Sequence, residues 1–222
     1  MKNTITKAFL FFFCGVILIS SLIFIPAGTF NYFGGILLVS VLFIPMFLSG
    51  IVMLVKSPKL LAERLEMKEK QKGQGRIITL SFFMFILGFI IAGLDFRFSI
   101  SEFEKISQII ASIIFLWGYI FYFIVLYQNK YLSRTIKVSE NQKVIDKGLY
   151  SVVRHPMYTS TLIMFLSMPI ILGSYITMII FLIYPFIISK RIILEEQLLK
   201  EELSGYKEYK EKVKYRLLPF IW

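Results

Sequence analysis

The only histidine in this sequence marks one place where chemistry could occur. His155 lies between Arg154 and Pro156 and follows a Gly-Leu-Tyr turn at residues 148–150. Proline disfavours helical backbone at the preceding residue and suits the first turn of a helix. We therefore expect His155 in extended backbone at the start of an apolar helix, beside free amide groups and the positive end of the helix dipole. An imidazole there can contact a polar ligand, and a purely structural His-Pro turn is an equal alternative.

A second candidate site follows that apolar helix. Arg191 and Glu195 are four residues apart, so they share one face if the segment is helical, whereas Glu196 points away from that face. An arginine can hold a carboxylate through two parallel hydrogen bonds, and a glutamate can pair with a cationic ligand. The alternative is an arginine whose stem covers apolar surface, with an exposed ion pair that contributes little.

The tail carries a third pattern, which contains no reactive group. Tyr206, Tyr209 and Val213 form one stripe of a basic segment, and the chain ends in Leu217–Trp222. A basic helix with an apolar stripe is typical of the membrane interface. We therefore expect a structural role for this stripe, with the helix lying on the bilayer.

The elements that must position these groups have the composition of a membrane protein. Of the 222 residues, 57% are hydrophobic and 18% are charged, against about 45–50% and about 25% in soluble domains. Long uncharged blocks exclude a soluble domain, a disordered tail and a nucleic-acid-binding domain. The net charge of +11 fits the Lys and Arg of cytoplasmic loops. Because Cys14 is the only cysteine, we expect no intrachain disulfide and no metal site.

Four uncharged blocks meet or approach the length of about 20 residues that a membrane-spanning helix needs. They are Ala8–Ala27, Phe33–Val55, Ile77–Leu94 and Ile106–Tyr127. A fifth block, Thr161–Ile188, is too long for one crossing, and Gly173–Ser174 interrupts it near the middle. We therefore predict that the fifth block is a helical hairpin.

The distribution of Lys and Arg supports that hairpin. With a hairpin, the N-terminus, residues 56–76, residues 128–160 and the tail share one side, which then holds 23 of the 25 basic residues. A single crossing would leave the basic tail on the opposite side, against the positive-inside rule. We predict an all-α integral membrane protein with four transmembrane helices plus a C-terminal hairpin, about six membrane segments, and both termini in the cytoplasm. The chain is expected to form one domain, 1–222, with a four-helix part, 1–127, and a part with connector, hairpin and tail, 128–222.

The order of these motifs resembles a known family. Residues 142–222, with the Gly-Leu-Tyr turn, Arg154–Tyr158, Arg191…Glu195-Glu196 and the Leu-Pro-Phe-Ile end, are similar to the C-terminal region of isoprenylcysteine carboxyl methyltransferases. That family is related to the phospholipid N-methyltransferases. Upstream, Ser57–Arg64 and Ala92–Phe98 resemble the N-terminal half of bacterial members.

The resemblance implies a cytoplasmic pocket for S-adenosyl-L-methionine. The residues implied to hold this cofactor are Gln142, Lys143, Val144, Ile145, Tyr150, His155, Pro156, Met157, Tyr158, Glu195 and Glu196. Arg191 and Glu195 are the implied catalytic residues, Arg191 facing the methyl acceptor and Glu195 the charged end of the cofactor. The sequence departs from the family pattern at Ser160, which replaces a glycine, and at Ile193-Leu194, which replace two acidic residues. It also has Gln142 where a histidine is common.

The chemistry of the two candidate sites fits carboxyl methylation. A carboxylate is ionised at neutral pH, with a reference pKa of roughly 3.5, so its methylation needs no general base. The expected partners are a lipophilic small molecule or a lipidated substrate and membrane lipid, with no nucleic acid and no metal.

Three other functions remain open from the sequence. An amine or phospholipid N-methyltransferase could use the same pocket, but its acceptor must lose a proton and Arg191 would repel it. A nicotinamide-dependent membrane reductase is possible although the chain has no Gly-x-Gly-x-x-Gly motif. A non-enzymatic scaffold would tolerate the loss of His155, Arg191 and Glu195 together.

Overall fold

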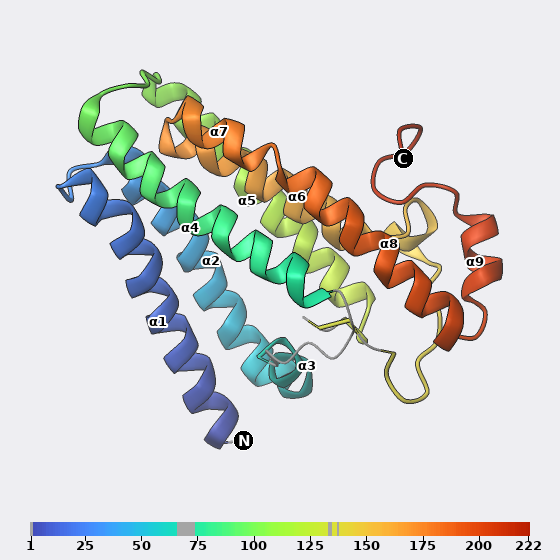
Figure 1. Cartoon of the computed structure of the whole chain (residues 1–222). Coiled ribbons are helices and arrows are strands. Elements are labelled where there is room, and N and C mark those ends of the chain that lie inside the picture. Colours follow the sequence, from blue (N-terminus) through green and yellow to red (C-terminus); the bar gives the residue numbers. More distant parts are fainter. Residues whose placement is uncertain (1, 66–73, 133–134, 137) are drawn as a thin grey trace.

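Every regular element in the described part of the chain is a helix, which confirms the predicted all-α class (Figure 1). The computed structural model describes residues 2–65, 74–132, 135–136 and 138–222. Residues 66–73, within the predicted loop 56–76, therefore lie outside the described residues. The elements are α1 (Lys2–Ala27), α2 (Phe33–Lys56), α3 (Pro58–Arg64), α4 (Gln74–Phe98), α5 (Lys105–Gln128), the short 3-10 helix η1 (Gly148–Ser151), α6 (Pro156–Leu172), α7 (Tyr175–Phe181), α8 (Tyr184–Glu202) and α9 (Tyr206–Lys212).

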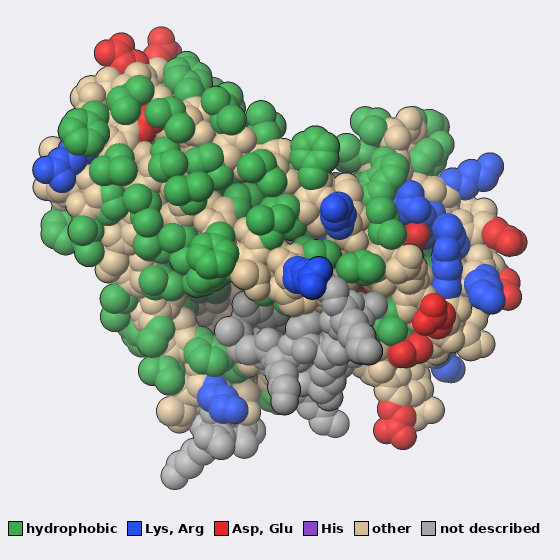
Figure 2. Space-filling view, viewed as in Figure 1, with side chains coloured by type: hydrophobic (Ala, Val, Ile, Leu, Met, Phe, Trp, Pro, Cys, Tyr) green, Lys and Arg blue, Asp and Glu red, His purple; other side chains and the backbone are tan. Residues whose placement is uncertain are grey.

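The described residues contain five helical segments long and apolar enough to cross a membrane, so the chain is an integral membrane protein. They are Thr4–Ala27, Phe33–Lys56, Gln74–Phe98, Lys105–Gln128 and Tyr175–Glu202. Helix α6 is also apolar but shorter. Figure 2 shows hydrophobic side chains over the body of the helices, whereas charged side chains gather at the end of the molecule that carries α9.

The fifth apolar block folds as the predicted hairpin. Helix α6 ends at Leu172, Gly173 adopts the left-handed conformation with φ 69°, and the Ser174 side chain accepts a hydrogen bond from the backbone N–H of Thr177. This turn reverses the chain because glycine has no Cβ to clash at positive φ. The returning arm breaks at Leu182–Ile183 and continues as α8 well past the membrane block. Arg191 and Glu195 therefore lie on the same long helix that leaves the apolar region.

A buried carboxylate fixes the turn of the hairpin to the end of α4. The Asp95 side chain is 1% exposed. It accepts hydrogen bonds from the Ser101 backbone N–H at 2.7 Å, from the Ser101 hydroxyl at 2.8 Å and from the Ser174 hydroxyl. These bonds satisfy the carboxylate oxygens, which a low-dielectric interior requires. Asp95 thus fixes the turn between α6 and α7, where the chain reverses and returns towards the site.

Helix α6 packs most extensively along α5. A Cβ at Gly118 of α5 would lie 2.8 Å from Met164 Cγ of α6, so the two helices approach closely only because Gly118 lacks one. The other arm of the hairpin packs on α4 through both α7 and α8. The hairpin is thus held from two sides, which places the first turn of α6 opposite the middle of α8.

Candidate functional site

His155 occupies the first position before α6, as the sequence predicted. Its backbone is non-helical, with φ −127° and ψ 58°, and Pro156 begins the helix. The chain's own tail holds this turn: the Arg154 N–H donates to Tyr215 O and the His155 N–H donates to Arg216 O, each at 2.9 Å. The backbone of His155 is therefore non-helical, as predicted, but not extended, and it is held by pairing with residues 215–216 as well as by the proline.

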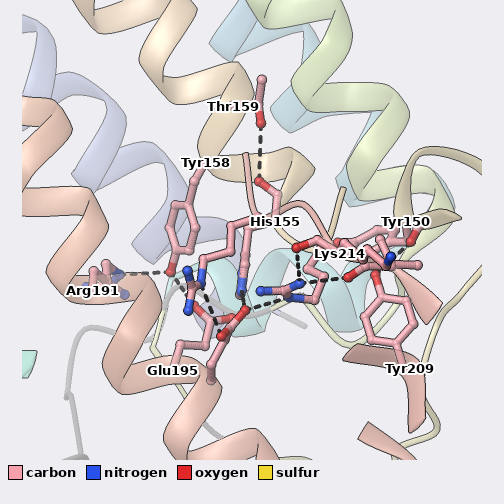
Figure 3. Close-up of polar contacts among 12 residues, drawn as sticks. Tyr150, His155, Tyr158, Thr159, Arg191, Glu195, Tyr209 and Lys214 are labelled. Atoms are coloured by element: carbon pink, nitrogen blue, oxygen red, sulfur yellow. Dashed lines mark hydrogen bonds and ion pairs between the residues drawn. The ribbon is translucent and has the colours of Figure 1, made fainter. Parts of the chain in front are cut away.

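Arg191 and Glu195 meet through a hydroxyl group that the sequence analysis did not place between them. The Tyr158 hydroxyl donates to Glu195 Oε2 at 2.5 Å and accepts a hydrogen bond from Arg191 Nε at 3.0 Å. Figure 3 shows Tyr158 reaching from α6 to both side chains on α8. The His155 ring stacks beside the Tyr158 ring, with centroids 5.8 Å apart. The structure thus brings the predicted imidazole and the predicted arginine and glutamate to one place.

Glu196 lies behind this site in a buried ionic cluster. Its Oε1 accepts a hydrogen bond from Arg154 Nε at 2.6 Å and lies 3.4 Å from His155 Nε2. Its Oε2 accepts a hydrogen bond from Arg216 Nε at 3.3 Å. Because the Glu196 side chain is only 3% exposed, its charge is balanced by these cations and not by water. Glu196 therefore joins α8, the His-Pro turn and the tail.

Arg154 contributes further to this joint. One of its terminal nitrogens donates to the backbone oxygens of Val213 and Lys214, each at 2.7 Å. The buried guanidinium therefore satisfies both a carboxylate and the end of the tail helix. Thr159 adds a hydrogen bond from its hydroxyl to Leu217 O at 2.8 Å.

A cavity of about 870 Å³ lies in front of the Tyr158 bridge. We call its wall on the connector, the start of α6, α8 and α9 the polar end. The residues from the predicted cofactor set that line it are Gln142, Lys143, Val144, Ile145, Tyr150, His155, Met157, Tyr158 and Glu195. Arg191 lines the same cavity. We call its lining on α1, α2, α4 and α5 the apolar arm, which includes Phe12, Met46, Phe47, Phe82, Phe85 and Phe123.

Two residues of the predicted cofactor set do not line the cavity. Pro156 is fully buried, and Glu196 is turned into the ionic cluster. A helix turns by about 100° between neighbouring residues, so Glu195 and Glu196 cannot both face the cavity from one turn of α8. The geometry therefore gives no support to the predicted direct contacts of Pro156 and Glu196 with the cofactor.

The tail tyrosines were interpreted wrongly from the sequence. Tyr206, Tyr209 and Val213 are 4–6% exposed and pack with Leu203 against Val144 and other connector residues, so their stripe faces protein and not lipid. Tyr206 and Tyr209 also line the polar end. The spacing identified the stripe correctly, but spacing alone does not show which surface covers it.

The tyrosines of the polar end are neutral hydrogen-bonding groups. Tyr209 donates to Tyr150 O at 2.7 Å, and the Tyr150 hydroxyl accepts a hydrogen bond from Asn129 Nδ2 at 3.0 Å. Burial raises the pKa of Tyr150, Tyr206 and Tyr209 above the usual value for tyrosine. The Tyr206 hydroxyl is buried and has no hydrogen-bond partner among the described residues. A buried hydroxyl in this state favours a polar ligand beside it.

The sequence analysis also missed Asn129, Tyr122 and Arg64, which line the cavity. Asn129 had no signal because it lies in an irregular connector. Tyr122 lies inside an apolar block, where its type does not distinguish it from a core residue. Among the described residues, no group of three or more His, Cys, Asp or Glu could hold a metal ion.

The comparison with known families agrees with this geometry. Residues 110–201, which run from α5 through the connector and hairpin to α8, match the model of the Isoprenylcysteine carboxyl methyltransferase (ICMT) family. The match includes His155, Tyr158, Arg191 and Glu195, so the residues that meet at the cavity lie within the family region. A search of curated proteins finds no significant match.

The match with the ICMT family model confirms the resemblance noted from the sequence, and a protein of that family is a methyltransferase. The apolar helices place this methyltransferase in a membrane. A membrane methyltransferase of this kind acts on a lipophilic or lipidated substrate.

Proposed function

We propose that the chain uses S-adenosyl-L-methionine to O-methylate the carboxylate of an isoprenylcysteine-like or other lipophilic substrate. The observation that carries the proposal is the shape of the cavity: one space joins a polar end to an apolar arm, with Arg191, Tyr158 and Glu195 on its wall. An amphiphile with a polar reacting group fits such a space. We further propose that this site and both termini face the cytoplasm, as the positive-inside rule predicts.

The polar end has the features that a nucleoside cofactor needs. It belongs to a cavity whose whole volume of about 870 Å³ lies within the range of about 300–1,000 Å³ found for small-molecule pockets. The Tyr206 hydroxyl offers a buried donor without a partner among the described residues. Residues 142–145 and Tyr150 would hold the adenosine part, and Glu195 would pair with the cationic end. When bound, the cofactor supplies a methyl group on a positively charged sulfur, which a carboxylate oxygen can attack while the carbon–sulfur bond breaks.

The chain's own residues then orient the acceptor and exclude water. Arg191 lines the cavity and its Nε donates to Tyr158, so its guanidinium is placed to orient an acceptor carboxylate there. Tyr158 fixes Glu195 and Arg191 relative to each other, which lowers the entropy that must be lost when two reactants align. The aromatic side chains of the apolar arm exclude water, which strengthens these charge interactions. No residue has to remove a proton, since the acceptor is already ionised.

The first test separates the cofactors. Purified protein in lipid nanodiscs is titrated calorimetrically with S-adenosylmethionine, with S-adenosylhomocysteine and with NADPH. We expect heats of binding with the first two, reduced at least about tenfold in affinity by Glu195→Gln, which removes the charge and keeps the shape. Binding of NADPH alone would support the reductase alternative and overturn the proposal.

The second test identifies the acceptor group. The protein is incubated with methyl-labelled cofactor and either N-acetyl-S-farnesylcysteine or a total lipid extract. A carboxylate acceptor gives a methyl ester, so the label should be released by mild base. A base-stable label in phospholipid headgroups would show the N-methyltransferase alternative instead.

A further inference from the structure

Residues 216–222 form a closed loop, which we call the tail loop. The backbone N–H groups of Arg216 and Leu217 both donate to Trp222 O, at 2.8 Å and 3.1 Å. The Arg216 Cζ lies 4.8 Å from the centre of the Trp222 ring, a cation–π distance. Leu217 is part of the buried core of the helices, and Trp222 packs against that core. Both ends of the tail loop are therefore fixed to the body of the protein.

The tip of the tail loop carries apolar side chains on the outside of the protein. Phe220 is 89% exposed, Ile221 is 76% exposed and Leu218 is 42% exposed. Figure 2 shows hydrophobic side chains projecting at the place where Figure 1 marks the C-terminal end, with Lys and Arg side chains beside them. Leaving large apolar side chains in water is unfavourable, and a contiguous patch of them marks a surface that contacts another molecule.

Helix α6 shows at which level of the membrane the tail loop lies. At its far end, α6 runs into the hairpin turn, where the Ser174 hydroxyl donates to Asp95 near the end of α4. Arg97 follows two residues later, and Glu102 and Glu104 lie between α4 and α5. Because charged side chains are costly inside the hydrocarbon, these residues place the hairpin turn at one boundary of the membrane.

The length of α6 then places its first turn near the opposite boundary. Its 17 residues span about 25 Å at a rise of about 1.5 Å per residue, and the hydrocarbon core is about 30 Å thick. The first turn of α6 therefore does not reach far beyond the hydrocarbon. Thr159 in this turn donates a hydrogen bond to Leu217 O at 2.8 Å. The tail loop is thus held at the level of the membrane boundary.

The exposed apolar surface of α8 reaches the same level. Phe186 and Ile193 are exposed side chains on the membrane-spanning segment Tyr175–Glu202. Ile193 lies just under one helical turn before Glu196, and Glu196 Oε2 accepts a hydrogen bond from Arg216 Nε at 3.3 Å. The apolar tip of the tail loop therefore begins where the lipid-facing surface of α8 ends.

Basic side chains border the apolar tip. Lys214 precedes the tail loop, and Lys207 and Lys212 lie on α9; all three are exposed. An element at the membrane interface has this composition, because its apolar side chains enter the boundary between headgroups and acyl chains while its cations stay among the headgroups. The charge around the tip therefore fits a lipid surface.

We propose that the tip of the tail loop, made of Leu218, Phe220 and Ile221, inserts into the lipid bilayer at the boundary between headgroups and acyl chains. The loop that carries this tip also holds the His-Pro turn, since the His155 N–H donates to Arg216 O at 2.9 Å. Insertion of the tip therefore fixes the depth of the His-Pro turn relative to the membrane surface. The proposal is independent of the identity of the cofactor and of the methyl acceptor.

The test measures the depth of the tip by electron paramagnetic resonance of a spin label. Cys14→Ser removes the only cysteine of the sequence, and Phe220→Cys or Ile221→Cys then places one label at the tip. Glu208→Cys, on the exposed face of α9, is the reference in water, and Phe186→Cys is the reference in lipid. The protein is placed in nanodiscs of phosphatidylcholine and phosphatidylglycerol. Collisions of each label with oxygen, which concentrates in lipid, and with a water-soluble nickel chelate are measured.

We expect the labels at Phe220 and Ile221 to lie about 5–10 Å inside the boundary. Their ratio of oxygen to nickel collisions should be close to that at Phe186 and severalfold higher than that at Glu208. Ratios at the tip equal to that at Glu208 would show that the tip lies in water and would overturn the proposal. Labels shielded from both reagents would show that protein, such as a second copy of the chain, covers the tip, which also overturns it. If one labelled variant does not fold, the other decides by the same comparison.

Discussion

Replacing Tyr158 with phenylalanine removes one hydroxyl group from the centre of the site and leaves the ring in place. That hydroxyl bonds to two charged side chains, at 2.5 Å to Glu195 and 3.0 Å from Arg191. The ring can keep its stacking on His155, whose centroid is 5.8 Å away. The variant therefore tests the bridge and not the packing of α6.

The expected effect follows from the strength of hydrogen bonds to charged groups, about 1.5–3 kcal/mol each. If aligning Arg191 and Glu195 depends on the bridge, the loss in transition-state stabilisation is of that order, which lowers kcat/KM about 10- to 100-fold. The matched control is Tyr32→Phe. Tyr32 does not line the cavity, and its hydroxyl donates to the neutral backbone oxygen of Leu172, so its removal should change kcat/KM by less than about threefold.

The assay is steady-state transfer of labelled methyl groups to N-acetyl-S-farnesylcysteine by protein in nanodiscs, together with thermal unfolding of each variant. Similar melting temperatures with a large fall in kcat/KM for Tyr158→Phe alone would support the bridge. An undiminished kcat/KM in Tyr158→Phe, or equal losses in both variants, would refute the reasoning.

Three further predictions concern stability. Glu196→Gln leaves Arg154 and Arg216 without their carboxylate and should lower the free energy of unfolding by about 3–5 kcal/mol. The control Asp146→Asn, which breaks the exposed pair with Lys212, should change that free energy by at most about 1 kcal/mol. Equal effects of the two variants in urea unfolding would contradict a stabilising role of the Glu196 cluster. Asp95→Asn should lower the free energy of unfolding by about 1–3 kcal/mol without changing cofactor affinity in calorimetry, because Asp95 does not line the cavity; a change in affinity would contradict its role at the turn. Burial raises the pKa of Tyr206 and Tyr209, so the folded state favours their protonated hydroxyls. The resulting contribution to stability is complete below pH about 10 and is lost as the pH rises further. Melting temperatures that fall between pH 8 and 9 in wild type but not in Tyr209→Phe would contradict this assignment.

The large-scale arrangement was accessible from the sequence because it depends on averages over many residues. Long uncharged blocks give the helices, and the uneven distribution of Lys and Arg requires the hairpin at Gly173–Ser174. The four-residue spacing of Arg191 and Glu195 places them on one face of α8, since a helix repeats every 3.6 residues. The position of His155 before a proline gives its non-helical backbone.

The contacts that assemble the site were not accessible in the same way. The Tyr158 bridge, the pairing of the tail with Arg154 and His155, and the Glu196 cluster all join segments distant in the sequence, and periodicity carries no information about such pairs. Arg64 had no local signal, because its place at the cavity depends on how α3 leaves α2. The stripe of Tyr206 and Tyr209 was visible, but whether protein or lipid covers it depends on the tertiary fold.

The most direct test of the central claim is an experimental structure of the protein with S-adenosylhomocysteine bound. The account predicts the ligand in the cavity, with its adenosine part against residues 142–145 and Tyr150 and its amino-acid part near Glu195. It also predicts that the Tyr158 hydroxyl still joins Glu195 and Arg191. Ligand density elsewhere on the protein, or a bound state in which Arg191 and Glu195 face different spaces, would contradict the account.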